Sequence, residues 1–142
     1  MGLDYLDIMI IHSPQPWVEV NQILLHISNT PLELVEYFQK QGIAVEAYSP
    51  IAHGEILHQP EIASMAEKYG VSVPQLCIRY TLQLGAISLP KTGNPEHMKT
   101  NADVDFEISA EEFQTYRKLW RKQRIPGIWR KAVNQIINQN IF

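Results

Sequence analysis

Side chains that can bind or catalyse stand at the ends of four short apolar segments. The segments are LDIMIIHSP (6–14), VNQIL (20–24), VEAYSP (45–50) and ISLPKTGNPE (87–96). The polar side chains at their ends are, in order, His12, Asn21 and Gln22, Tyr48 and Ser49, and Lys91 and Thr92. In parallel α/β barrels the functional residues lie at the carboxyl ends of the strands. The order therefore predicts successive wall segments of one active-site mouth.

Each of these side chains has its own chemistry. His12 can exchange a hydrogen bond with a substrate carbonyl with little reorganisation. Asn21 and Gln22 offer amide donors and acceptors that match a carboxamide. Tyr48 offers a flat face for stacking, and Ser49 can donate to a phosphate. For each residue, a purely structural role at a strand end or a turn stays open from the sequence alone.

The segment Lys91–Asn94 shows the clearest physical pattern. A strand ends in a lysine and a threonine, Gly93 follows, and Asn94 caps a helix that Pro95 opens. Free N–H groups at a helix N-terminus and the helix dipole favour a bound anion, and the lysine adds a full positive charge. An ordinary exposed loop is the alternative.

Alternating strands and helices must position these residues. Short, nearly continuous apolar runs predict parallel strands at 5–11, 18–25, 43–48 and 86–90. Capping boxes predict helix starts at Thr30–Glu33, Ser72–Gln75 and Ser109–Glu112. Helix ends are predicted at Gly42, Gly70 and Gly85. Pro50 and Gly54 predict a loop between the strand at 43–48 and the next helix. This is the pattern of an α/β protein with a parallel sheet.

The chain has 142 residues, enough for one domain. A complete (β/α)8 barrel typically needs about 250 residues. If the strands belong to such a barrel, we expect a partial parallel TIM-type barrel with about four of the eight strands, plus C-terminal helices. The first two predicted strands are joined by the five residues 13–17. A crossover between parallel strands needs about a dozen residues or more. Either these two strands are antiparallel, or a crossover unit is missing after Trp17.

Composition narrows the class of protein. No run approaches the ~18 uninterrupted apolar residues of a membrane span, and the acidic Asp4 argues against a signal peptide. Cys77 is the only cysteine, so no internal disulfide forms and a cytoplasmic location is expected. Because Cys77 lies in the apolar run LCIRY, we interpret it as a packed small residue. No histidine or cysteine spacing indicates a metal site.

Charge divides the chain into two regions, an expected barrel part at 1–116 and a basic amphipathic tail at 117–142. Seven of the twelve Lys and Arg residues lie from Arg117 onward, and no acidic residue follows Glu112. The tail also carries apolar residues at helical spacing: Ile128, Trp129, Ala132, Val133, Ile136 and Ile137. A helix that packs on the body or across a dimer interface is favoured over one on an anionic membrane surface. Nucleic acid is not expected, because the acidic body would repel it.

Together these motifs resemble the second half of an aldo-keto reductase. GLDYLDIMIIHSP resembles the family pattern LGLDYLDxxxIHxP, and VEAYSPIAHG resembles its aromatic-Ser-Pro-Leu motif with Ile51 in place of leucine. Lys91, Thr92 and Asn101 match the pattern PKS/T-x-x-x-x-R-x-x-x-N, with His97 where the family usually has arginine. The resemblance covers about residues 1–16 and 20–115, and it favours a missing internal segment after Trp17 over an antiparallel pair of strands.

The resemblance implies NAD(P)H-dependent reduction of a small aldehyde or ketone. His12 would be catalytic and would orient the carbonyl. The implied cofactor-binding residues are Asn21 and Gln22 at the carboxamide, Tyr48 at the nicotinamide ring, Ser49, Pro50 and Ile51 at the pyrophosphate, and Lys91, Thr92, Gly93, His97 and Asn101 at the adenosine 2′-phosphate and adenine. NADPH is the expected cofactor. NADH is also possible, because His97 lacks the bidentate grip of arginine on phosphate.

The resemblance also places a catalytic tyrosine, lysine and aspartate on earlier strands, whose motifs this chain does not carry. We therefore expect a truncated enzyme whose activity requires the missing half. The alternative is a non-catalytic truncated barrel, an interaction protein that forms homo-oligomers through exposed barrel edges or the C-terminal tail.

Overall fold

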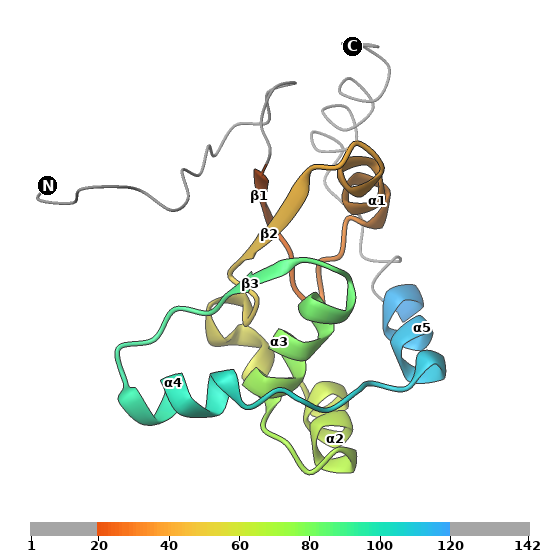
Figure 1. Ribbon diagram of the computed structural model, residues 1–142. Helices are drawn as coiled ribbons and strands as arrows, with labels where there is room; N and C mark the ends of the chain where they lie inside the picture. Colours follow the sequence, from red (N-terminus) through yellow and green to blue (C-terminus); the bar gives the residue numbers. More distant parts are fainter. Residues whose placement is uncertain (1–19, 120–142) are drawn as a thin grey trace, which may run out of the picture.

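The computed structural model describes residues 20–119, with side chains described to Arg117. Within this range the chain forms a three-stranded parallel sheet in the order β1-β2-β3 (Figure 1). The strands are β1 (Val20–Leu24), β2 (Ala44–Tyr48) and β3 (Ile87–Leu89). Strands and helices alternate, so the predicted α/β class with a parallel partial barrel is confirmed. The predicted first strand with His12, and nearly all of the tail, lie outside the described residues.

The helices lie between and after the strands. In chain order they are α1 (Leu32–Lys40), the 3₁₀ segment η1 (Ala52–His58), α2 (Pro60–Lys68), α3 (Val73–Gln83), α4 (Pro95–Ala102) and α5 (Ala110–Leu119). The segment η1 is kinked at His53 and Gly54, whose φ values of 53° and 91° are non-helical, so the region predicted as a loop contains short helical turns on either side of a kink. None of the helices in the described range is long and apolar enough to span a membrane.

Three helices end in the same way, each on a glycine that the sequence analysis predicted. Gly42, Gly70 and Gly85 have φ values of 74°, 64° and 75°. At the end of α1, the Gly42 N–H bonds the Gln39 carbonyl at 3.0 Å and the Ile43 N–H bonds the Phe38 carbonyl at 2.9 Å. This pair of bonds is the Schellman motif, which needs a left-handed residue that glycine adopts without steric cost.

The helix starts follow the predictions less closely. Ser72 caps α3 in a complete capping box with Gln75, as predicted. Thr30 does not cap α1, because its hydroxyl donates to the His26 carbonyl at 3.0 Å and bonds the Tyr80 hydroxyl at 2.9 Å. The capping-box prediction at Thr30 was therefore wrong. A buried tertiary partner, Tyr80, holds the hydroxyl that would otherwise have bonded the helix N-terminus.

The capping box predicted at Ser109 forms in half. The Ser109 hydroxyl accepts from the Glu112 N–H at 3.3 Å, as a cap should. The reciprocal bond is absent among the described contacts, because the Ser109 N–H donates to the Tyr69 hydroxyl and that hydroxyl donates to the Glu112 carboxylate. Lys68 bonds the same carboxylate, and these donors lower the pKa of Glu112. The start of α5 is thus fixed to the end of α2.

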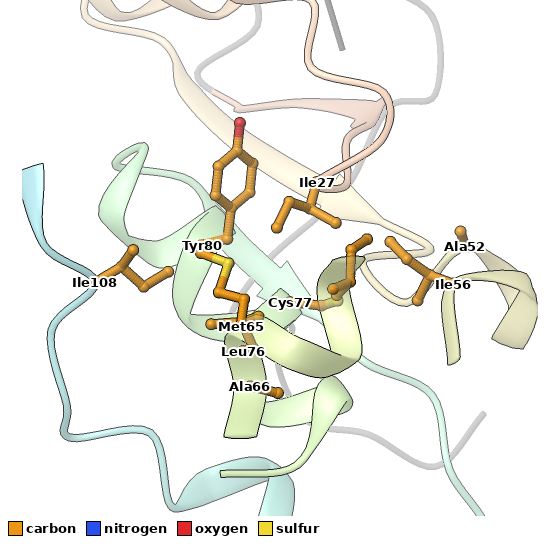
Figure 2. Close-up of a cluster of buried hydrophobic side chains, with 10 residues drawn as sticks. Ile27, Ala52, Ile56, Met65, Ala66, Leu76, Cys77, Tyr80 and Ile108 are labelled. Carbon is orange, nitrogen blue, oxygen red and sulfur yellow. The ribbon is translucent and has the colours of Figure 1, made fainter. Parts of the chain in front are cut away.

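Two apolar clusters hold the elements together. One lies between the sheet and α1, where Val35 and Phe38 pack with Val45 and Ala47. The other surrounds Tyr80 of α3 (Figure 2). Its buried members are Ile27, Ala52, Ile56, Ile62, Met65, Ala66, Leu76, Cys77, Tyr80 and Ile108. Burial raises the pKa of Cys77 to about 12, as expected for a packed thiol that does not act as a nucleophile.

An extended segment at 103–108 runs along α3 and leads from α4 towards α5 (Figure 1). Gln75, Arg79 and Gln83 lie four residues apart on one face of α3. Each donates a hydrogen bond to a backbone carbonyl of the segment at 103–108. The Gln83 amide bonds both the N–H and the carbonyl of Ile108, at 2.7 and 3.1 Å. This row of polar side chains holds the segment in place, and the sequence analysis did not identify it.

Candidate functional site

The carboxyl ends of the three strands meet at one edge of the sheet. Leu24, Tyr48 and Leu89 are register partners across β1, β2 and β3. Because all three strands are parallel, the segments that follow these residues leave from the same edge. The two predicted anion-binding segments, at 49–51 and 91–93, therefore start from neighbouring strands.

The alternation of side chains along the strands separates two residues that the sequence analysis grouped. Asn21 is the register partner of Val45, on the face that packs against α1, and it is 2% exposed. Gln22 is the partner of Glu46 and lies on the opposite face. The Asn21 Nδ2 has no hydrogen-bond partner among the described residues. Asn21 and Gln22 therefore do not converge on one carboxamide.

Gln22 shares its face with two residues of β2. Glu46 is its direct partner, and Tyr48 lies two residues further along the same face. Gln22 donates from Nε2 to Glu46 Oε2 at 3.3 Å, and Tyr48 is 38% exposed. The Gln22 amide, whose oxygen is not used in this bond, and the accessible ring of Tyr48 thus lie on the same face near the carboxyl ends of the strands.

Glu46 is a residue that the sequence analysis missed. It is 2% exposed, although it carries a carboxylate in the middle strand of the sheet. The sequence did hold a signal, because a glutamate inside the apolar run AVEAY breaks the pattern of a buried strand. Register was needed to identify its partner Gln22.

The segment after β2 has an unusual backbone. Ser49, Ala52 and His53 have φ values of 52°, 46° and 53°, in the left-handed region that non-glycine residues rarely adopt. The Ser49 hydroxyl and His53 Nε2 lie 3.1 Å apart. Pro50 is buried, and Ile51 packs on the cluster around Tyr80. Strain of this kind is characteristic of binding sites, where the surroundings hold the backbone in place.

His26 lies near this segment and has an altered titration. Burial lowers the pKa of His26 to about 4, because the charged form loses water. Glu55 opposes this shift and His53 adds to it. The His26 ring bonds the Ser28 hydroxyl at 3.0 Å. Among residues 20–119, no group of three or more His, Cys, Asp or Glu side chains is arranged to hold a metal.

The segment after β3 leads into the N-terminus of α4. Lys91 is exposed, and the Thr92 hydroxyl accepts from the Asn94 N–H at 3.1 Å, which leaves its own proton free to donate. Asn94 caps α4 by accepting from the Glu96 N–H at 3.0 Å. The predicted cap and helix start are therefore confirmed, and a charged amine and a free hydroxyl proton lie close to the helix start.

Gly93 has no steric role within the described chain. Its φ is not positive, and a Cβ at this position would meet no atom within 4 Å. The backbone there is therefore open to a close approach by a ligand. Together with Lys91 and Thr92, this opening fits a phosphate group of a nucleotide cofactor.

The two remaining predicted residues lie on α4. His97 and Asn101 are four residues apart, so they share one face of the helix. His97 is exposed and Asn101 is half-buried. Glu96 in the first turn pairs with Lys99 at 3.3 Å, which moderates the negative charge next to the proposed phosphate position.

Comparison with known proteins gives the family. Residues 18–121 match the model of the aldo/keto reductase family. An uncharacterized oxidoreductase, C2F3.05c, of Schizosaccharomyces pombe is 44% identical over 67% of this chain and 35% of its own length. The glyoxal reductase of Bacillus subtilis is 36% identical over 75% of this chain and 39% of its own length.

A solved structure supports the same assignment. A Bombyx mori aldo-keto reductase in complex with NADP aligns with a TM-score of 0.62 at 34% identity, over 68% of this chain and 35% of that one. The chain thus spans well under half the length of these relatives. The match over most of the chain, together with the parallel sheet and the residues at its carboxyl edge, shows that the chain belongs to the aldo/keto reductase family.

Proposed function

We propose that this chain supplies the nicotinamide-cofactor cradle of an aldo/keto reductase that uses NADPH to reduce a small aldehyde or ketone. The observation that carries the proposal is the shared sheet face of Gln22 and Tyr48, with Lys91 following the next strand at the same edge. Tyr48 and Lys91 are far apart in the sequence, and the parallel register brings their strands together.

The residues at this edge divide the recognition of the nucleotide. Tyr48 presents its ring for stacking, and Gln22 presents an amide oxygen to a carboxamide. Ser49 and the strained segment after it offer donors to the pyrophosphate. Lys91 and Thr92 hold the 2′-phosphate, and Gly93 leaves room for its approach. The bound nucleotide supplies the hydride.

The catalytic role assigned to His12 stays a prediction, because His12 lies outside the described residues. We assign it the orientation of the substrate carbonyl. The proton donor and the groups that tune it would come from barrel strands that this chain does not contain. Reduction therefore requires either a longer parent protein or a second chain.

The test is a calorimetric titration of the 142-residue chain with NADPH and with NADH. Lys91→Met is expected to weaken NADPH binding about tenfold, since one charged hydrogen bond to phosphate is lost. NADH binding should not change, because NADH lacks the 2′-phosphate. Gly93→Ala should weaken NADPH binding while leaving the fold intact. Lys40→Met, which changes an exposed lysine at the end of α1, is the matched control.

Equal loss of NADPH affinity in Lys40→Met would show a non-specific effect of charge. Absence of any binding by the wild-type chain would contradict the proposal.

A second candidate function is favoured by one observation. Within the described sheet, β1 and β3 each pair on one side, and Ile87 of β3 is 44% exposed. Open strand edges and exposed apolar side chains favour association. Under this alternative the chain is a non-catalytic interaction protein that forms homo-oligomers. Self-association without nucleotide binding would favour it.

We also propose a cytoplasmic location. The support is the single cysteine, Cys77, which is buried in the core and free. Detection of the native chain in a cytosolic fraction would test this proposal.

A further inference from the structure

Glu46 is buried on the sheet face that carries the proposed nicotinamide site. It is 2% exposed and lies in the middle strand, between Gln22 of β1 and Ile87 of β3. Burying a carboxylate costs free energy unless hydrogen bonds compensate it. Its one described side-chain bond comes from Gln22 Nε2, at 3.3 Å. The burial of this carboxyl group is therefore linked to the orientation of one amide.

The chemistry of Glu46 decides which way the Gln22 amide faces. An ionised carboxylate has no proton to give, so it only accepts hydrogen bonds. In the structure the amide nitrogen of Gln22 faces Glu46 and donates to its Oε2 at 3.3 Å. The Gln22 oxygen is directed away from Glu46 and remains available as an acceptor. No donor among the described residues bonds it.

We propose that Glu46 is a positioning residue that makes Gln22 select a ligand group able to donate a hydrogen bond. The inference rests on the proposed function, in which that group is the NH2 of the nicotinamide carboxamide. Glu46 does not touch the ligand in this arrangement. It acts by holding the Gln22 oxygen outward, on the face where Tyr48 presents its ring.

The selectivity follows from the fixed amide. With its nitrogen held by Glu46, Gln22 offers the ligand an acceptor. A carboxamide NH2 satisfies that acceptor, whereas the methyl group of an acetyl analogue cannot. If Glu46 is removed, the amide is free to rotate and to present either atom. The chain should then lose its preference for the carboxamide, although the rest of the cradle is intact.

The experiment titrates the full chain with three nucleotides: NADP⁺, its 3-acetylpyridine analogue, and 2′,5′-ADP, which lacks nicotinamide. The wild-type chain is expected to bind NADP⁺ about tenfold more tightly than the acetylpyridine analogue. Glu46→Met keeps the length of the side chain and removes the acceptor. It should reduce that preference to about twofold or less, with 2′,5′-ADP affinity unchanged. Glu46→Gln keeps the shape of the side chain but can also donate to the Gln22 oxygen, so it should weaken the preference as well.

The outcomes separate this inference from the proposed function. If the wild-type chain binds 2′,5′-ADP but does not distinguish NADP⁺ from its analogue, the role of Glu46 is overturned, whatever the variants do. A full preference in Glu46→Met overturns it as well. If none of the three nucleotides binds, the proposed function fails and this inference fails with it.

Discussion

At the scale of single residues, the candidate site combines side chains whose roles depend on their neighbours. The Gln22 amide donates to Glu46, and the role proposed for Gln22 depends on that bond. A Cβ at Gly93 would meet no atom of the described chain within 4 Å, so packing there does not require a glycine. The sequence indicated Gln22 and Gly93 from their motifs. It could not indicate that Asn21 lies on the opposite face, because this depends on the pleat and register of the strand.

The partial burial of His26 predicts that the stability of the chain depends on pH. The pKa of His26 is about 4 in the folded chain, against an ordinary value of 6.5. Below pH 6.5 the unfolded chain binds a proton that the folded chain does not, so stability is lost as the pH falls from 6.5 to 4. Because His26 is only partly buried, we expect a loss of about 1–2 kcal/mol in the free energy of unfolding.

Urea unfolding at a series of pH values measures this dependence. His26→Gln should flatten the profile between these two pH values, whereas His58→Gln, at an exposed position in η1, should leave it unchanged. A profile that is equally steep in His26→Gln would assign the dependence to another group.

At the scale of elements, local signals predicted helix ends better than helix starts. The three terminating glycines were identified because a left-handed residue after an amphipathic run has few alternatives. Thr30 was misassigned, because its hydroxyl bonds Tyr80, which lies 50 residues away. The segment η1 was missed for a similar reason, since its residues Ala52 and Ile56 pack into the cluster around Tyr80.

The polar row on α3 predicts a large effect at its last member. Gln83→Ala removes both hydrogen bonds to the Ile108 backbone, and Ile108 is fully buried. Buried backbone groups left without partners cost about 1–3 kcal/mol each, so we expect a loss of about 2–3 kcal/mol in the free energy of unfolding.

Gln39→Ala is the matched control for this change. Gln39 makes one hydrogen bond to the Leu84 carbonyl and is exposed, so its loss should cost less than about 1 kcal/mol. Hydrogen exchange at the Ile108 amide should accelerate in Gln83→Ala alone. Equal costs for the two variants would show that the row does not hold the segment at 103–108.

At the scale of the whole molecule, the described sheet has a face and edges that three strands do not close. One face is covered by α1, and the other carries Gln22, Tyr48 and Ile87. Three of the four strands predicted from apolar runs form the described sheet, and the first lies outside the described residues. What lies against the second face depends on contacts between distant segments or separate chains, and no local pattern encodes it.

Exposure of Ile87 predicts self-association of the isolated chain. Sedimentation velocity should show a mass that increases with concentration in the micromolar range. Ile87→Lys should abolish the increase, because a charged side chain at a strand edge opposes pairing. Leu57→Lys changes a side chain of η1 that is 41% exposed and should leave association unchanged. A monomer at all concentrations would contradict the prediction.

The repeated glycine endings have a consequence for how such a chain can diverge. Helices α1 and α3 each reach the next strand through the same short turn, with Gly42 and Gly85 in left-handed geometry. The connections that follow the carboxyl ends of the strands are longer than these turns, and they carry the proposed ligand contacts. Insertions at 90–94 would leave the turns into the strands untouched, whereas the connection at 49–59 also carries Ala52 and Ile56 of the cluster around Tyr80. Ligand specificity can therefore change through the connections at the carboxyl ends of the strands. The glycine turns at the amino ends keep the order of the strands.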